Sequence, residues 1–103
     1  MRKIEPASFV GERPWQALDI EAIEDATVPL HWTDRPYRWH VNDGPEVFVP
    51  LDGSVTMHYR RAGQEHCLVL GPGDICHAEA GDEHFAEPHG TVRILVIEKA
   101  GSP

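Results

Sequence analysis

The chain is poor in cysteine and has no long apolar run. Its two cysteines, Cys67 and Cys76, are too few for a disulfide framework and lack the spacing of a metal site. We expect both to be small buried apolar residues in a reducing compartment. No stretch approaches the roughly 18 apolar residues that a membrane helix needs, and the N-terminus lacks the apolar segment of a signal peptide. These absences predict a cytoplasmic protein without a membrane partner.

Basic side chains are also scarce. Nine residues are Lys or Arg and 17 are Asp or Glu, which gives a formal net charge of -8 at pH 7. A nucleic-acid-binding protein needs a basic surface to neutralise phosphates, and this composition does not supply one. The same charge repels anionic membranes. We therefore expect neither nucleic acid nor a membrane surface among the partners.

Proline and glycine, nine of each, are scattered along the chain. Between them lie short runs in which apolar and polar residues alternate, the pattern of strands. We predict strands at 28–32, 37–42, 46–51, 54–60, 65–70, 75–78 and 91–99. The stretch 15–25 is ambiguous between a strand and a short helix. About eight or more short strands at this spacing predict an all-β sandwich or barrel.

The length of 103 residues fits one domain. We expect residues 1–14 to be irregular, 15–100 to form the domain, and 101–103 to be a tail. An edge strand within 15–32 could pair with a second subunit, which predicts a homodimer.

A possible metal site lies around the turn Asn42-Asp43-Gly44-Pro45. His40 and Asn42 share one face of the strand before the turn, because strand side chains repeat every two residues. Glu46 opens the strand after the turn, so we expect it to face them across a hairpin. His84, expected on a short loop, is the best third donor. Two histidines and one carboxylate suit a first-row divalent metal and leave positions open for substrate or dioxygen.

These residues also fall into two spaced motifs. Residues 40–53 resemble the first motif of the cupin superfamily, with His40, Glu46 and Gly53 in register. Residues 73–84 resemble the second, with Gly73, Gly81 and His84 in register. The resemblance covers about residues 28 to 98 and implies a double-stranded β-helix, or jelly roll, with a site inside the mouth of the barrel.

Three positions depart from the cupin motifs. Asn42 stands where the family usually has a second histidine, Glu79 where it has proline, and Pro88 where it often has asparagine. Asn42 either supplies its amide oxygen to the metal or orients water or substrate. An amide oxygen is neutral and holds first-row metals less well than imidazole.

Two residues are candidates for contact with a substrate. Arg38 lies on the His40 face, where it either anchors an acidic group or is a solvated side chain at a strand end. His77 either lines the barrel or is exposed. His31 has no evident partner and is expected at the surface.

The resemblance leaves two classes of function open. The first is a metal-dependent enzyme of dioxygenase or isomerase type that acts on a small acidic or oxygen-containing molecule, with iron, manganese, nickel or zinc as the metal. The alternative is a non-enzymatic module that binds or senses a small ligand with weak or no metal binding.

Overall fold

A computed structural model describes all 103 residues, and it is almost entirely β-structure. The elements are η1 (Pro6–Ser8), β1 (Gln16–Ile23), β2 (Ala26–Thr33), β3 (His40–Val41), β4 (Glu46–Arg61), β5 (Gln64–Leu70), β6 (Cys76–Ala78) and β7 (Glu83–Lys99). Most of the ambiguous stretch 15–25 is therefore a strand. The seven strands include two of 16 and 17 residues, β4 and β7, each of which covers the length of two shorter strands.

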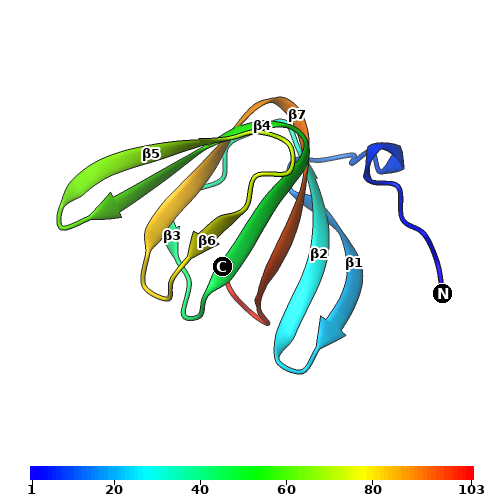
Figure 1. The fold of residues 1–103 in the computed structure, drawn as a ribbon, viewed down its shortest axis with the longest axis horizontal. Coiled ribbons are helices and arrows are strands. Elements are labelled where there is room, and N and C mark those ends of the chain that lie inside the picture. Colours follow the sequence, from blue (N-terminus) through cyan, green and yellow to red (C-terminus); the bar gives the residue numbers. More distant parts are fainter.

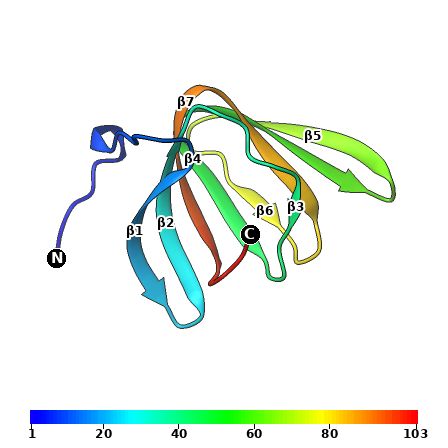
Figure 2. The same ribbon diagram turned by 180° about the vertical axis from the view of Figure 1, so that it is seen from behind.

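The strands form one antiparallel sheet in the order β1-β2-β7-β4-β5, with β3 paired to β7 and β6 paired to β4. The long strands β4 and β7 pair along most of their length and bend together at the top of the view in Figure 1. One half of the pair, formed by the start of β4 and the end of β7, lies between β6 and β2, with β1 outside β2. The other half, formed by the end of β4 and the start of β7, lies between β5 and β3 (Figures 1 and 2). The folded sheet is an unclosed jelly-roll barrel, as predicted.

The bend in β4 lies at Asp52-Gly53, between the two strands predicted at 46–51 and 54–60. The strand instead runs on through this point, and its register with β7 shifts between Pro50 and Asp52 and again between Asp52 and Ser54. Gly53 has a φ of 71°, and a Cβ there would lie 2.6 Å from the backbone oxygen of Thr91. Glycine is required because the conformation is left-handed and the partner strand leaves no space.

The core fills the inside of the bend. It consists of nine buried residues: Phe48, Val55, Met57, Leu70, Cys76, Ala86, Val92, Ile94 and Val96. Cys76 behaves as the small buried apolar residue that was expected, whereas Cys67 is exposed on β5. The expectation failed for Cys67 because every residue of β5 before Leu70 is exposed, so the strand has no buried face there.

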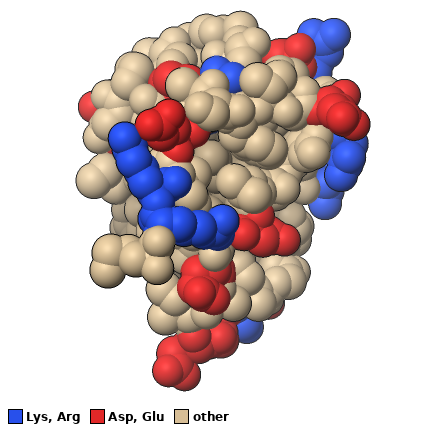
Figure 3. Space-filling view, turned by 90° about the vertical axis from the view of Figure 1, so that its right-hand side faces the viewer, with Lys and Arg blue, Asp and Glu red and all other residues tan.

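No helix is long and apolar enough to cross a membrane. On the face in Figure 3, basic side chains lie next to acidic ones and do not form a continuous basic footprint.

Candidate metal centre

Three side chains from three different strands meet inside the barrel. His40 lies on β3, Glu46 begins β4, and His84 is the second residue of β7. One ligand atom from each lies within 4.8 Å of the other two. Glu46 and His84 are buried, with His84 Nε2 lying 3.6 Å from Glu46 Oε1. The structure thus brings together the two histidines and the carboxylate that the sequence singled out.

The strand pairing that assembles them differs from the expected hairpin. His40 pairs directly with His84, because β3 is antiparallel to β7. Glu46 pairs with Ala78 of β6 and with Glu98 near the end of β7. His84 is therefore held in a strand rather than on a loop. The turn before Glu46 is tied to the second motif, since Gly81 N donates a 3.1 Å hydrogen bond to the carbonyl oxygen of Asn42.

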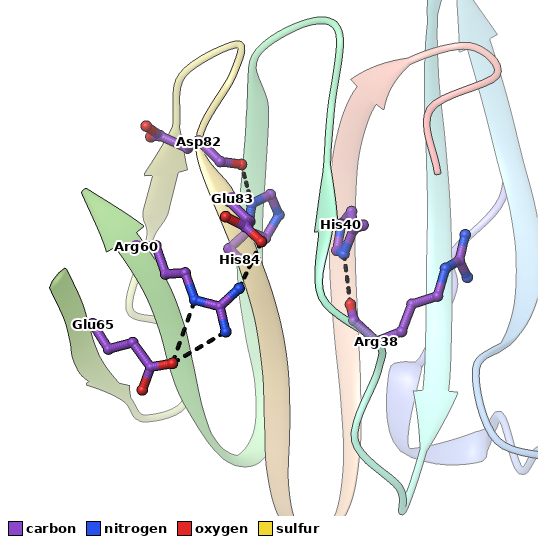
Figure 4. A network of polar contacts seen from close by, with 7 residues as sticks. All are labelled: Arg38, His40, Arg60, Glu65, Asp82, Glu83 and His84. Atoms are coloured by element: carbon purple, nitrogen blue, oxygen red, sulfur yellow. Dashed lines mark hydrogen bonds and ion pairs between the residues drawn. The ribbon is translucent and has the colours of Figure 1, made fainter. Parts of the chain in front are cut away.

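Hydrogen bonds to backbone carbonyls orient both imidazole rings. His40 Nδ1 donates to the carbonyl oxygen of Arg38 at 2.9 Å, and His84 Nδ1 donates to that of Asp82 at 2.8 Å (Figure 4). A carbonyl oxygen can only accept, so each Nδ1 carries a proton, and in the neutral ring Nε2 keeps its lone pair. This is the arrangement by which proteins fix the tautomer and orientation of a metal-binding histidine.

Two buried acceptors in this cluster have no partner. They are His84 Nε2 and Asn42 Oδ1. Asn42 is 2% exposed, and its amide nitrogen donates a 2.7 Å hydrogen bond to Glu46 Oε2, which leaves the amide oxygen free. Buried polar atoms without partners are rare because each costs about 1–3 kcal/mol. A cation among these lone pairs would satisfy both atoms, so the residues present fit a metal ion.

The Glu46 side chain is strongly shifted toward its charged form. Burial alone would raise the pKa of Glu46, but the neighbouring His84, Glu98 and Asn42 side chains lower it to about 2. Burial, and then the hydrogen bond and repulsion from Glu46, raise the pKa of Glu98 to about 8. Two adjacent buried carboxyl groups share one proton in this way. Glu46 is the member of the pair that stays ionised and available to a cation.

The cluster opens into a cavity of about 180 Å³. Aromatic and apolar side chains form much of its wall, together with the polar residues of the cluster. Its lining includes Trp15, His31, Tyr37, His40, Glu46, Phe48, Met57, His84, Ala86, Val96 and Glu98. None of the residues lining it is a lysine or an arginine.

The arrangement of strands matches solved cupin structures. A cupin-2 domain protein from Shewanella frigidimarina superposes with a TM-score of 0.76 at 22% identity, and the match covers 86% of this chain and 84% of that one. The fold is that of a small cupin. No protein-family model matches the sequence, and no curated protein does.

Two enzymes also contain a region with this cupin fold. Hydroquinone 1,2-dioxygenase from Sphingomonas sp. TTNP3, with 4-hydroxybenzoate bound, has a TM-score of 0.77 and 19% identity; the match covers 88% of this chain and 29% of that one. Hydroquinone 1,2-dioxygenase PnpCD in complex with Fe3+ has a TM-score of 0.78 and 16% identity, with coverages of 87% and 29%. This chain therefore spans less than a third of each enzyme chain.

Neither predicted substrate contact lies in the cupin cavity. Arg38 is exposed, its Nη1 donates to the hydroxyl of Tyr37 at 2.9 Å, and its guanidinium points away from His40 (Figure 4). Residues 37–39 are not a strand, so the expected alternation does not hold and Tyr37 turns inward instead. His77 is exposed on β6 and lines two other depressions.

Sequence reasoning missed two residues that do line the cavity, His31 and Glu98. His31 was expected at the surface because it had no evident partner. Leu30 and Trp32 lie on the other face of β2. That face is also covered, however, since Gly11 packs against the ring of Trp32. Glu98 continues the inward alternation of Val92, Ile94 and Val96. A carboxylate in that alternation was a signal that could have been found.

Outside the barrel, a clamp of charged side chains fixes the start of β7. Arg60 Nη1 donates to Glu83 at 2.7 Å, and Arg60 also bonds Glu65 and stacks 3.8 Å above the ring of Trp39 (Figure 4). Since Glu83 precedes His84 and Trp39 precedes His40, this clamp holds the two strands that carry the histidines.

Proposed function

We propose that the protein is a small cupin that binds one divalent transition metal and, through it, a small oxygen-containing molecule. His40, Glu46 and His84 supply two nitrogens and a carboxylate, and Asn42 adds its amide oxygen. The observation that carries the proposal is the pair of unpartnered buried acceptors, His84 Nε2 and Asn42 Oδ1, beside an ionised carboxylate.

The donor set is compatible with iron, manganese, nickel or zinc. When bound, such an ion supplies a Lewis acid with open positions for substrate oxygens or dioxygen. The protein's own contribution is to hold the ligands and to exclude water. Tyr37 and Trp15, whose ring centroids lie 5.2 Å apart, form a wall next to His40.

The cavity favours a neutral, hydroxylated molecule of about one ring. A cavity of roughly 150 Å³ is enough for benzene, and this one is about 180 Å³. It holds two carboxyl groups and no basic side chain other than histidines, while Arg38 points elsewhere. An acidic substrate would therefore be repelled unless the metal neutralised it.

A metal-dependent dioxygenase is the enzyme class that the comparisons favour, because two matching cupin regions belong to hydroquinone 1,2-dioxygenases. The alternative is a binding or sensing module without turnover. It is favoured by the small share of those enzymes that this chain spans, 29%.

Elemental analysis tests the metal site. Protein purified without added metal or chelator should hold close to one equivalent of one transition metal, and His84→Ala purified in parallel should hold none. Exposed His66 provides the control, since His66→Ala should keep the metal. Wild-type protein that neither carries metal nor takes up added iron, manganese, nickel or zinc would overturn the proposal.

The predicted homodimer also belongs to this proposal. β1 is an edge strand of the sheet, and an unpaired edge can extend a sheet into a second copy. Sedimentation equilibrium should give twice the monomer mass. A monomer at all concentrations would exclude the dimer without affecting the metal site.

A further inference from the structure

A third imidazole lines the cavity, and like the two at the metal centre it has its Nδ1 next to a backbone carbonyl oxygen. His31, on β2, has its Nδ1 3.4 Å from the carbonyl oxygen of Trp15. As at His40 and His84, a carbonyl partner places the proton on Nδ1 and leaves Nε2 with a lone pair. His31 does not belong to the group of residues close enough to share a metal ion. Its free nitrogen is thus an acceptor in the cavity that the metal centre does not use.

His31 stands at one end of a continuous row of rings. From the metal centre, the ring centroids of His84 and His40 lie 4.3 Å apart, and those of His40 and Tyr37 lie 5.0 Å apart. Tyr37 and Trp15 follow at 5.2 Å, and Trp15 and His31 at 5.8 Å. A molecule held at the metal would extend along this row with its ring against aromatic side chains. His31 offers a hydrogen-bond acceptor at the other end.

The backbone at Trp15 is strained in a way that positions His31. Trp15 has a φ of 62°, which is uncommon for a non-glycine residue. Such conformations persist where surrounding contacts hold them, and they are concentrated at functional sites. Here the strained residue contributes both the carbonyl oxygen that orients His31 and the ring that packs edge-on against it.

Burial also keeps His31 in its accepting form. It lowers the pKa of His31 below 6.5, and the hydrogen bond to Trp15 and the charge of Glu46 only partly oppose this effect. The imidazole is therefore neutral near pH 7. A neutral imidazole with its proton on Nδ1 accepts a hydrogen bond at Nε2.

We infer that His31 is a specificity-determining residue whose Nε2 accepts a hydrogen bond from a hydroxyl of the bound molecule, at the end away from the metal. The inference rests on the proposed function, and it narrows the ligand class to small single-ring diols. One oxygen of such a diol faces the metal and the other donates to His31.

The test compares two probes that differ in one donor. Hydroquinone has a second hydroxyl, whereas 4-fluorophenol has a fluorine of similar size that cannot donate. Zinc-loaded protein is titrated anaerobically with each probe by calorimetry, since zinc has no redox chemistry to consume them. The proteins are wild type, His31→Phe, His31→Gln and the exposed control His66→Phe, and the zinc content of each is measured first.

Wild type and His66→Phe should bind hydroquinone roughly three- to ten-fold more tightly than 4-fluorophenol, the size of one net hydrogen bond. His31→Phe should abolish that preference, and His31→Gln should restore part of it through its amide oxygen. Zinc content should be equal in all four. The ratio of affinities would not respond to a merely structural role of His31.

Two results would overturn the inference while the proposed metal site stands. One is a preference that His31→Phe leaves intact, and the other is zinc-loaded wild type that shows no preference or does not bind hydroquinone. Wild-type protein that holds no zinc or other transition metal would instead overturn the proposed function, and with it the role of His31.

Discussion

His40 and His84 are register partners across β3 and β7, and their ring centroids lie 4.3 Å apart. Backbone carbonyls hold both Nδ1 atoms, and His84 Nε2 lies 3.6 Å from Glu46 Oε1. Without a cation, the buried Nε2 of His84 has no hydrogen-bond partner. The metal-free protein therefore carries a cost that a bound ion would remove.

Metal binding should raise the stability of the protein. An ion that binds only the folded state contributes roughly 3 kcal/mol at a free concentration of about 100 times its dissociation constant. Urea denaturation of wild type with zinc and with a chelator should show a gain of that order. His84→Ala should lose the gain, whereas His66→Ala should keep it. Equal stability of wild type in zinc and in chelator would contradict the prediction.

Asn42→Asp should separate the two roles of Asn42. In the metal-free protein, the substitution replaces the amide that donates to Glu46 with a second carboxylate. We expect a loss of about 1–3 kcal/mol from the free energy of unfolding, because a buried hydrogen bond becomes a repulsion. Zinc should stabilise this variant at least as much as wild type, since a carboxylate replaces the amide oxygen.

The neighbouring substitution Asp43→Asn is the matched control, because the Asp43 side chain is 69% exposed. It should change the stability by less than about 0.5 kcal/mol. If Asn42→Asp were as stable as wild type without metal, the hydrogen bond to Glu46 would have no energetic role.

Gly53→Ala should destabilise the bend of β4. The φ of 71° is unfavourable for alanine, and the added Cβ would lie 2.6 Å from the oxygen of Thr91. We expect a loss of about 2–3 kcal/mol in urea denaturation. Gly63→Ala separates the two causes, because Gly63 has a φ of 77° but nothing within 4 Å of its Cβ position. That variant should lose only about 1 kcal/mol, and equal losses at both positions would rule out the clash with Thr91.

His31 should make the metal-free protein less stable in acid. Burial lowers the pKa of His31 in the folded state below its usual value of 6.5. The unfolded chain therefore takes up a proton at His31 at a pH where the folded protein does not, and stability falls as the pH drops below 6.5. In His31→Gln this loss is removed, so its free energy of unfolding should fall less steeply than that of wild type between about pH 7 and pH 5. Urea denaturation across that range checks the slope, with His66→Gln as the exposed control. An unchanged slope would show that His31 is not desolvated.

The sequence by itself determined the class of fold and the residues of the candidate metal centre. Alternation of apolar and polar residues is a local property of a strand, and it marked the strands that contain Val55 and Val92. The spacing of His40, Asn42 and Glu46, with His84 in the second motif, could be read without any coordinates. Strands can be recognised in a sequence because backbone geometry imposes a two-residue repeat of side chains on any strand.

Only the tertiary structure decided which strands pair and which faces are covered. The turn at Asn42 looked like a hairpin, yet β3 pairs with β7, because pairing depends on contacts between segments distant in the sequence. Residues 37–39 are not part of a strand, so the predicted alternation does not apply to them. Tyr37 lines the cavity and Arg38 is exposed. His31 faces the cavity because the N-terminal segment at Gly11 covers the opposite side of β2. A strand that is covered on both faces lacks the alternation of exposed polar and buried apolar residues. The residues that line the cavity could therefore not be predicted from the sequence.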